Sequence, residues 1–219
     1  MNDLGETFSA GGPLGGVVKD FRPRPFQVEM AQAGAEAIEG KTVLVAEAGT
    51  GTGKTFAYLV PALLSGGKVI ISTGTKTLQD QLYAGDIPPV RAALNVPVTV
   101  ALLKGRANYV CHYHLARARE GGLLPSRDDV GYLEEIARFA ARSTTGDRAD
   151  CSTVPENAGA WLHATSTREN CLGSQCSHYD RCFLMEARRQ ALAADVVVVN
   201  HHLFFADMVL RGEGMAELL

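Results

Sequence analysis

Residues 43–55, VLVAEAGTGTGKT, combine residue types that bind phosphate. A β-branched apolar segment, which predicts a strand, leads into a turn whose three glycines let the backbone take positive φ and point successive N–H groups into one concavity. A helix expected from about Lys54 adds the positive end of its dipole. At this spacing Lys54 reaches the β- and γ-phosphates of a nucleotide and the Thr55 hydroxyl takes a Mg²⁺ ligand position. Ala48 stands where the strict pattern has glycine, so the stretch predicts the alanine-tolerant form of a P-loop rather than a glycine-rich turn without a ligand.

Four of the five cysteines form a second candidate site. Cys111 stands alone, and Cys171, Cys176 and Cys182 follow as C-x4-C-x5-C. Structural zinc sites more often use cysteine pairs of closer spacing, whereas wide gaps suit the more widely spread ligands of an iron–sulfur cluster. From spacing alone, a [4Fe–4S] cluster, a zinc ion and buried structural thiols all stay open. Cys151 is interpreted as a free thiol.

The histidines divide in the same way. His112, His114 and His178 lie beside these cysteines in the sequence, and we interpret them as surface residues or as partners of the ligands. Asn200 and His201 follow a run of valines. The carboxyl edge of a parallel sheet faces the ligand, so this pair has the better claim to a functional position.

Alternating strands and helices must position these residues. Apolar runs predict strands at 68–72, 96–103 and 195–200, and helical patterns predict helices at 27–39, at 54–64 and after Thr75, its expected N-cap. This rhythm predicts a mainly parallel α/β sheet. Between 104 and about 189 it gives way to helices near 108–120 and 129–142 and a cysteine-rich loop, which we interpret as an insertion. The glycine-rich residues 1–20 are expected to be flexible, and the prolines of 21–26 predict a loop that presents Gln27.

Composition sets outer limits on function. The chain has 219 residues, 46% of them hydrophobic and 21% charged, which is typical of a globular protein. A formal net charge of −3 excludes a uniformly basic surface, so any nucleic-acid contact must come from local patches. We see no membrane helix and no secretory signal in the sequence and expect a cytoplasmic protein without a membrane partner. An odd number of cysteines argues against a disulfide framework.

Taken together, these features resemble the bacterial DinG/YoaA helicases, relatives of XPD within superfamily 2 that carry an iron–sulfur domain inside the first motor domain. The matching segments occur in the family's order and cover nearly everything from Phe21 onward. They are RPRPFQ, EAGTGTGKT, STGTKTLQDQL, KGRANYVC, the three later cysteines and ADVVVVNHHLF.

The resemblance implies a fold, cofactors and a substrate. The fold is an α/β, partial RecA-like P-loop domain interrupted by a helical iron–sulfur insertion. Its parts are a flexible N-terminus at 1–20, a Q-type lead-in with Walker A and motif Ia at 21–104, the insertion at 105–189, and the return to the RecA-like domain at 190–219. The implied cofactors are ATP, Mg²⁺ and a [4Fe–4S] cluster. The expected function is that of a monomeric helicase moving 5′ to 3′ on single-stranded or forked DNA in repair or replication.

The resemblance also assigns residues. Gln27 is expected to read the adenine, and the remaining nucleotide residues are Ala48, Gly49, Thr50, Gly51, Thr52, Gly53, Lys54 and Thr55, with Lys54 and Thr55 catalytic. The expected cluster ligands are Cys111, Cys171, Cys176 and Cys182. The expected DNA contacts are Thr73, Thr75, Lys76, Lys104 and Arg106.

No DEAH box follows Asn200, and no second motor domain is present. We therefore expect the N-terminal part of a longer helicase, which alone folds marginally, binds nucleotide poorly and hydrolyses it negligibly. Two alternatives belong to other classes. One is a redox-sensing iron–sulfur DNA-binding P-loop module, and the other is a zinc-stabilised P-loop ATPase whose client is not a nucleic acid.

Overall fold

The structure is a computed structural model that describes residues 3–121 and 126–212. The chain divides into two compact units, each with a hydrophobic core of its own. We call residues 1–102 with 193–205 the sheet unit, and residues 103–192 with 206–219 the cysteine unit. No helix within the described ranges is both long and apolar enough to span a membrane.

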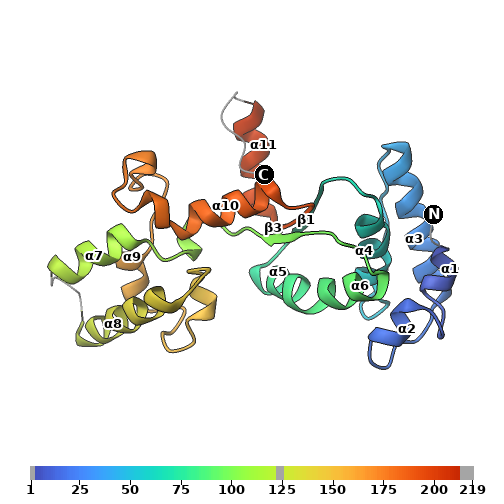
Figure 1. Ribbon diagram of the computed structural model, residues 1–219, viewed down its shortest axis with the longest axis horizontal. Helices are drawn as coiled ribbons and strands as arrows, with labels where there is room; N and C mark the ends of the chain where they lie inside the picture. The colour runs from blue at the N-terminus through green and yellow to red at the C-terminus, as the bar shows by residue number, and fades with distance from the viewer. Residues whose placement is uncertain (1–2, 122–125, 213–219) are drawn as a thin grey trace. The chain divides into compact units, whose positions relative to one another are not determined.

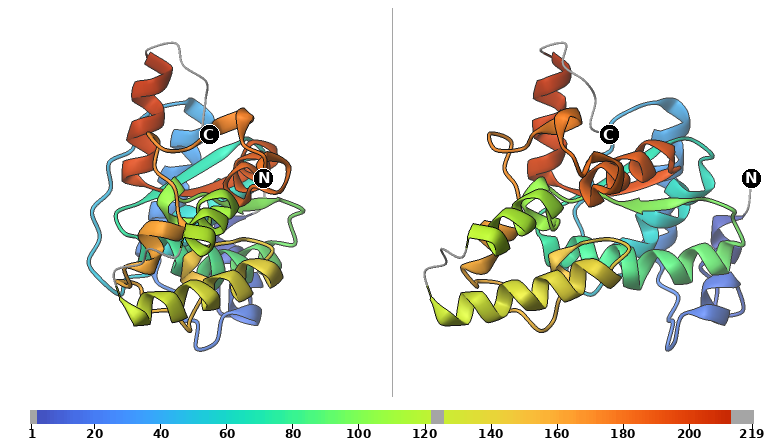
Figure 2. Two further views of the ribbon diagram at one scale, coloured as in Figure 1. Left: turned by 90° about the vertical axis from the view of Figure 1, so that its left-hand side faces the viewer. Right: turned by 60° about the vertical axis from the view of Figure 1, so that its left-hand side comes forward.

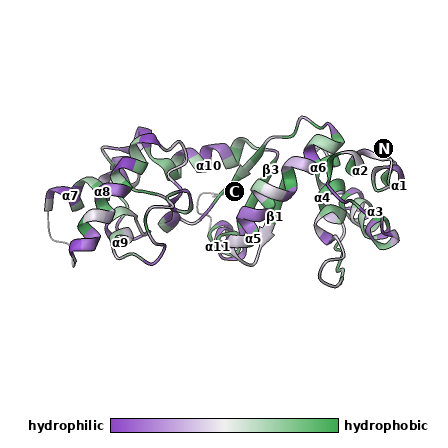
Figure 3. Cartoon of the chain, turned by 90° about the horizontal axis from the view of Figure 1, so that it is seen from below, coloured by the Kyte–Doolittle hydropathy of each residue, from purple (hydrophilic) through white to green (hydrophobic). Residues whose placement is uncertain are grey.

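Three parallel strands form the sheet of the first unit. They are β1 (Val69–Thr73), β2 (Val100–Leu102) and β3 (Val196–Asn200), in the order β1-β3-β2 (Figure 1). Val196 is in register with Val69 on one side and with Val100 on the other. Every residue of β3 is buried, as expected for a continuous valine run in the centre of a parallel sheet. Figure 3 colours the chain by hydropathy and shows the sheet strands as hydrophobic. The predicted α/β class with a parallel sheet is confirmed.

Six α-helices of the sheet unit precede or separate these strands. Their bounds are α1 (Leu4–Thr7), α2 (Pro13–Val17), α3 (Pro25–Gly40), α4 (Lys54–Leu64), α5 (Lys76–Gln81) and α6 (Ile87–Leu94), with a π-helical turn at Leu82–Asp86 joining the last two. α3 and α4 lie side by side (Figures 1 and 2). Leu59 and Leu63 of α4 and Val90 of α6 are buried in one core. α4 begins and ends as predicted and runs through Pro61.

Two predictions about the N-terminal region are wrong. Residues 1–20 were expected to be flexible, yet α1 and α2 form there because Phe8 and Leu14 are buried in the core of the sheet unit. The proline-rich lead-in was expected to be a loop as far as Gln27. α3 instead begins at Pro25, since proline is well suited to the first turn of a helix, where its missing N–H is not needed. Gln27 therefore sits on a helix.

The segment before residues 48–53, the predicted phosphate loop, also differs from expectation. Residues 42–49 are outside any helix or strand, although the apolar run predicts a strand there. Val43 and Val45 are each 91% exposed. A parallel strand is held by hydrogen bonds to its neighbours, and the sheet order β1-β3-β2 includes no pairing for this segment. Without hydrogen bonds to a neighbouring strand, the alternating valines of this segment do not form a strand. The predicted strand at 96–103 is likewise reduced to the three residues of β2.

The cysteine unit is mainly helical. Its helices are α7 (His112–Gly121), α8 (Arg127–Arg142), α9 (Ala160–Ala164) and most of α10 (Phe183–Ala193), and the final helix α11 (His201–Gly212) starts in the sheet unit. Ile136, Trp161 and Leu184 are among its buried side chains. Between α9 and α10 the chain is irregular, with short 3₁₀ turns at Gly173–Gln175 and Tyr179–Arg181. The predicted helices near 108–120 and 129–142 correspond to α7 and α8.

Candidate nucleotide-binding site and cysteine cavity

Two of the three glycines in the phosphate loop have the positive φ that the sequence predicts. Gly51 has φ +71° and Gly53 has φ +86°, whereas Gly49 is not among the residues of positive φ. Gly53 is also the N-cap of α4, so the helix begins directly behind the loop. A side chain at Gly53 would overlap the amide of Gln27, which packs against it. Glycine is therefore required there both by conformation and by space.

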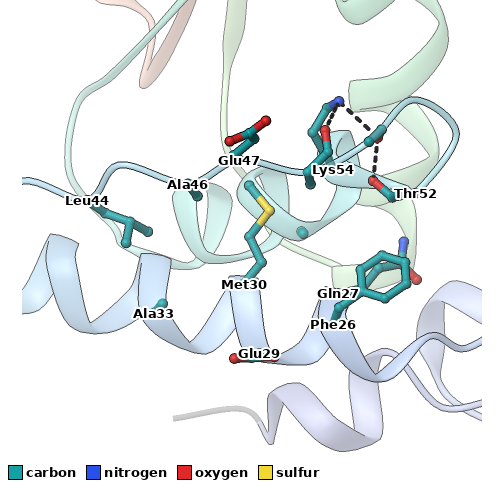
Figure 4. A pocket seen from close by; sticks show the side chains of 13 residues that line it. Phe26, Gln27, Glu29, Met30, Ala33, Leu44, Ala46, Glu47, Thr52 and Lys54 are labelled. Carbon is teal, nitrogen blue, oxygen red and sulfur yellow. Dashed lines mark hydrogen bonds between the residues drawn. The ribbon is translucent and has the colours of Figure 1, made fainter.

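Lys54 points back into the loop. Its Nζ donates to the carbonyl oxygens of Ala48 at 2.7 Å and Gly49 at 3.1 Å, and the Thr52 hydroxyl donates to the Gly49 carbonyl at 2.8 Å (Figure 4). The ammonium group thus lies at the loop, where the sequence predicts that a nucleotide phosphate binds. If the predicted nucleotide binds, its phosphates would replace these carbonyl groups as partners of Lys54.

A cavity of about 440 Å³ adjoins the loop. Its wall is formed by one face of α3 and by the extended segment before the loop; the lining includes Phe26, Gln27, Met30, Ala33, Leu44, Ala46, Glu47 and Lys54 (Figure 4). Gln27 is only 3% exposed, and its Nε2 donates to the Gly53 carbonyl at 3.1 Å. Its Oε1 is buried without a hydrogen-bond partner in the described part of the chain. A buried acceptor left unpaired costs free energy, and a donor group on a ligand would remove that cost.

Thr55 lies in the first turn of α4 and is partly buried. Burial raises the pKa of Tyr58, one turn later on the same helix, and a hydrogen bond with Thr55 opposes that effect. Tyr58 is therefore a neutral phenol at neutral pH. The Thr55 hydroxyl is held at the loop end of the helix, where the sequence predicts a Mg²⁺ ligand.

The cysteine unit contains a second cavity, of about 240 Å³. All four of the predicted ligands line it, namely Cys111, Cys171, Cys176 and Cys182, and each is a free thiol. Cys151 is outside this cavity and is 5% exposed in the core of the unit. The fold thus gathers in one place four thiols that lie as far as 71 residues apart in the chain, and it separates them from the fifth.

The cavity is rich in sulfur and in positive charge. Arg106 Nη1 donates to Cys171 Sγ at 2.8 Å, and Arg188 also lines the cavity. Burial raises the pKa of the Cys111 thiol, and Cys182 and Cys176 add to that rise. Soft thiolate ligands select zinc or iron–sulfur centres. In the described ranges, no three His, Cys, Asp or Glu side chains are gathered closely enough to hold a metal ion.

The three nearby histidines occupy different places. His114 lines the cavity and bonds through Nε2 to the carbonyl of Asn170 at 3.2 Å. His112 packs against the Phe183 ring at 4.7 Å between centroids, and its pKa is lowered by burial. His178 bonds through Nδ1 to Arg181 at 2.9 Å.

Polar residues gather where β1 and β3 end. Thr75 caps α5 by accepting from Leu78 N at 3.2 Å, as the sequence predicts, and Lys76 is exposed. Asn200 caps α11 by accepting from Leu203 N at 2.8 Å. His201 Nδ1 lies 2.7 Å from Ser72 Oγ and so links the ends of the two strands. Sequence reasoning missed Ser72, although its position at the end of an apolar run was the available signal.

Lys104 is the candidate DNA contact whose placement corrects the expectation. It is 2% exposed, and its Nζ lies 2.6 Å from Asp147 Oδ2. A buried, paired ammonium is not available to a DNA phosphate at the surface, so the geometry gives Lys104 a structural role. Arg106 is engaged by Cys171 as described above. Thr73 is also bonded within the protein, its Oγ1 donating to the Thr75 carbonyl at 3.0 Å.

The class of protein is indicated by the parallel sheet, the phosphate loop and helix α4, which follows the loop. Residues 24–98 match the DEAD/DEAH box helicase family, and the chain carries part of such a helicase domain with its RecA-like fold.

Comparison with individual proteins points to a smaller group of helicases. The chain is 48% identical to the ATP-dependent DNA helicase YoaA of Haemophilus influenzae and 50% identical to YoaA of Escherichia coli, matches that cover 100% and 98% of this chain. It is 34% identical to the ATP-dependent helicase DinG of Mycobacterium tuberculosis over 87% of the chain. The resemblance to the DinG/YoaA helicases is confirmed. The chain spans about a third of the length of these relatives, 34%, 34% and 32%.

Proposed function

We propose that this chain is the N-terminal part of an ATP-dependent DNA helicase that moves 5′ to 3′ along single-stranded DNA in repair or replication. The observation that supports it most is the loop of residues 48–53, with Lys54 directed into it and a 440 Å³ cavity alongside. The relatives named ATP-dependent DNA helicases support the substrate and the reaction class. We further propose a monomeric, cytoplasmic motor that acts on forked DNA.

In this proposal ATP and Mg²⁺ bind at the loop. The N–H groups of residues 48–53 and the N-terminus of α4 take the phosphates, Lys54 binds the β- and γ-phosphates, and Thr55 binds Mg²⁺. Gln27 recognises adenine, because its unpaired Oε1 can accept from the exocyclic amino group while Nε2 stays on Gly53. Hydrolysis depends on positioning metal, water and a compensating cation together. Lys54 and Thr55 supply part of that arrangement.

Single-stranded DNA is proposed to pass the carboxyl edge of the sheet. Thr73 is the last residue of β1, Thr75 and Lys76 follow it, and Lys76 is the exposed cation among the three. A lysine at such a place contributes a phosphate contact that weakens as salt rises. Arg106 belongs to the cysteine unit, and we propose it only as a DNA contact beside the cysteine cavity.

The cysteine unit is proposed to be the iron–sulfur insertion, spanning about residues 105–189. Cys111, Cys171, Cys176 and Cys182 would hold a [4Fe–4S] cluster, which when bound supplies four iron–thiolate bonds. Arg106 and the backbone N–H of Gly173 both donate to Cys171, which orients that sulfur. By tying Cys111 to the segment from 171 to 182, these ligands would act chiefly as a structural clasp.

The decisive experiment measures ATP hydrolysis by the complete protein with and without single-stranded DNA, after anaerobic purification. Strong stimulation by DNA in a brown, iron-containing protein is expected. ATP hydrolysis that ignores DNA, together with reversible electron transfer, would favour a redox-sensing module. A colourless protein with stoichiometric zinc would favour the zinc-stabilised ATPase and remove the cluster.

A further inference from the structure

Two side chains at the start of α3 hold the phosphate loop from outside. Arg24, the N-cap residue of α3, donates through Nη1 to the carbonyl of Gly51. Gln27, three residues later, donates through Nε2 to the carbonyl of Gly53 at 3.1 Å. The two acceptors are the two loop glycines of positive φ. One short stretch of the lead-in therefore binds alternate carbonyl groups of the loop.

The direction of a carbonyl decides the direction of the next N–H. No cis peptide occurs in the described ranges, and in a planar trans peptide the C=O and N–H bonds point in opposite directions. When Arg24 holds the Gly51 carbonyl, the N–H of Thr52 is turned away from Arg24. When Gln27 holds the Gly53 carbonyl, the N–H of Lys54 is turned away from Gln27. The pair thus sets the orientation of two peptide groups whose N–H donors belong to the phosphate cradle.

The remaining loop carbonyls are held differently. Those of Ala48 and Gly49 are bound by Lys54, whose ammonium must leave them to meet a phosphate. Arg24 lies outside the loop and can keep its bond when a nucleotide arrives. A Cβ atom added at Gly51 would meet open space, whereas one added at Gly53 would overlap the Gln27 amide. Arg24 is thus the side chain that holds the Gly51 carbonyl.

We propose that Arg24 is a positioning residue for the phosphate loop, holding the Gly51–Thr52 peptide in the orientation in which its N–H group can bind a nucleotide phosphate. This inference rests on the proposed nucleotide site and adds to it a residue that acts through the loop backbone rather than on the adenine. It also gives the RPRPFQ lead-in a second function besides presenting Gln27.

The test compares Arg24→Met and Arg24→Lys with Arg22→Met, an exposed arginine two residues earlier that serves as the matched control. Affinities of the complete protein for Mg²⁺-ATP and for inorganic tripolyphosphate are measured by calorimetry. Arg24→Met is expected to weaken both ligands by about tenfold, the loss of one charge-assisted hydrogen bond. Arg24→Lys should recover part of that loss, and Arg22→Met should bind both as the wild type does.

Two results would overturn the proposal. One is equal binding by the wild type and Arg24→Met. The other is a loss for ATP with no loss for tripolyphosphate, which would make Arg24 an adenine contact. A complete wild-type protein that binds neither ligand would instead overturn the nucleotide site itself, and the positioning role with it.

Hydrogen–deuterium exchange adds a readout that needs no nucleotide. In the ligand-free protein, amides of residues 49–55 should exchange faster in Arg24→Met than in the wild type or Arg22→Met, while the melting temperature stays unchanged. Unaltered exchange in this loop would contradict the proposed clamp.

Discussion

Lys104 and Asp147 form an ion pair of 2.6 Å between side chains that are 2% and 9% exposed. The same region is held by Tyr109, whose hydroxyl accepts from Lys104 N at 3.0 Å and whose backbone forms a bridge with Asp147. These contacts join the first residues of the cysteine unit to the turn after α8. A buried pair of this kind is sensitive to the loss of one partner, because the other charge is then left unpaired.

Lys104→Met should lower the free energy of unfolding of the cysteine unit by about 3–5 kcal/mol, since it strands the Asp147 carboxylate. The double variant Lys104→Met/Asp147→Leu should recover most of that loss. Chemical denaturation followed by Trp161 fluorescence measures both, because Trp161 is buried in the same core. A single variant of unchanged stability but weaker DNA binding would show that Lys104 contacts DNA after all.

Lys54→Ala should reduce ATP hydrolysis by the complete protein by about a hundredfold or more, since it removes the cation that is proposed to bind the β- and γ-phosphates. Its iron content should not change, because the loop and the cysteine cavity lie in different units. Lys19→Ala, at an exposed lysine of the same unit, is the control and should retain activity. ATPase activity surviving in Lys54→Ala would mean that the loop is not the catalytic site.

Cys176→Ser should lose iron and DNA unwinding while keeping some nucleotide binding. The matched control is Cys151→Ala, because Cys151 is a buried thiol of the same unit that does not line the cavity. That variant should keep its iron and its colour. Metal analysis and visible absorption of the anaerobically purified proteins measure the difference, and equal iron in both variants would make the ligand assignment wrong.

Stability of the sheet unit should fall on acidification through Asp195. Its carboxylate accepts hydrogen bonds from Thr99 N and Thr99 Oγ1, both at 2.7 Å. These bonds, the backbone one first, lower the pKa of Asp195. Its contribution to stability is therefore present above the unfolded-state pKa of about 3.9 and is lost as the pH falls through the lower folded-state value.

The measurement for Asp195 compares the melting temperatures of the wild type and Asp195→Asn across this range. The wild type should be the more stable above about pH 5, and the difference should shrink as Asp195 becomes protonated. A difference that is the same at every pH would show that the charge on Asp195 does not contribute.

Several features followed from residues that are neighbours in the sequence. The valine run of β3, the start of α4 after Gly53 and the Thr75 cap of α5 depend on local periodicity, backbone freedom and short-range hydrogen bonds. The order of the motifs along the chain also sufficed to identify the resemblance to the helicase family, because that order can be read without knowing which residues are in contact.

Contacts between distant residues decided the rest. Phe8 and Leu14 fold a segment of weak local pattern because a core is available to bury them, and Val43 and Val45 stay exposed because no strand of the sheet pairs with them. Burial of Lys104 beside Asp147, the meeting of Cys111 with the three later cysteines in one cavity, and the reach of Arg24 to Gly51 each bring together parts of the chain at least 27 positions apart. Local sequence sets which conformations a segment prefers, whereas only the folded chain determines which groups are buried and which partners they meet.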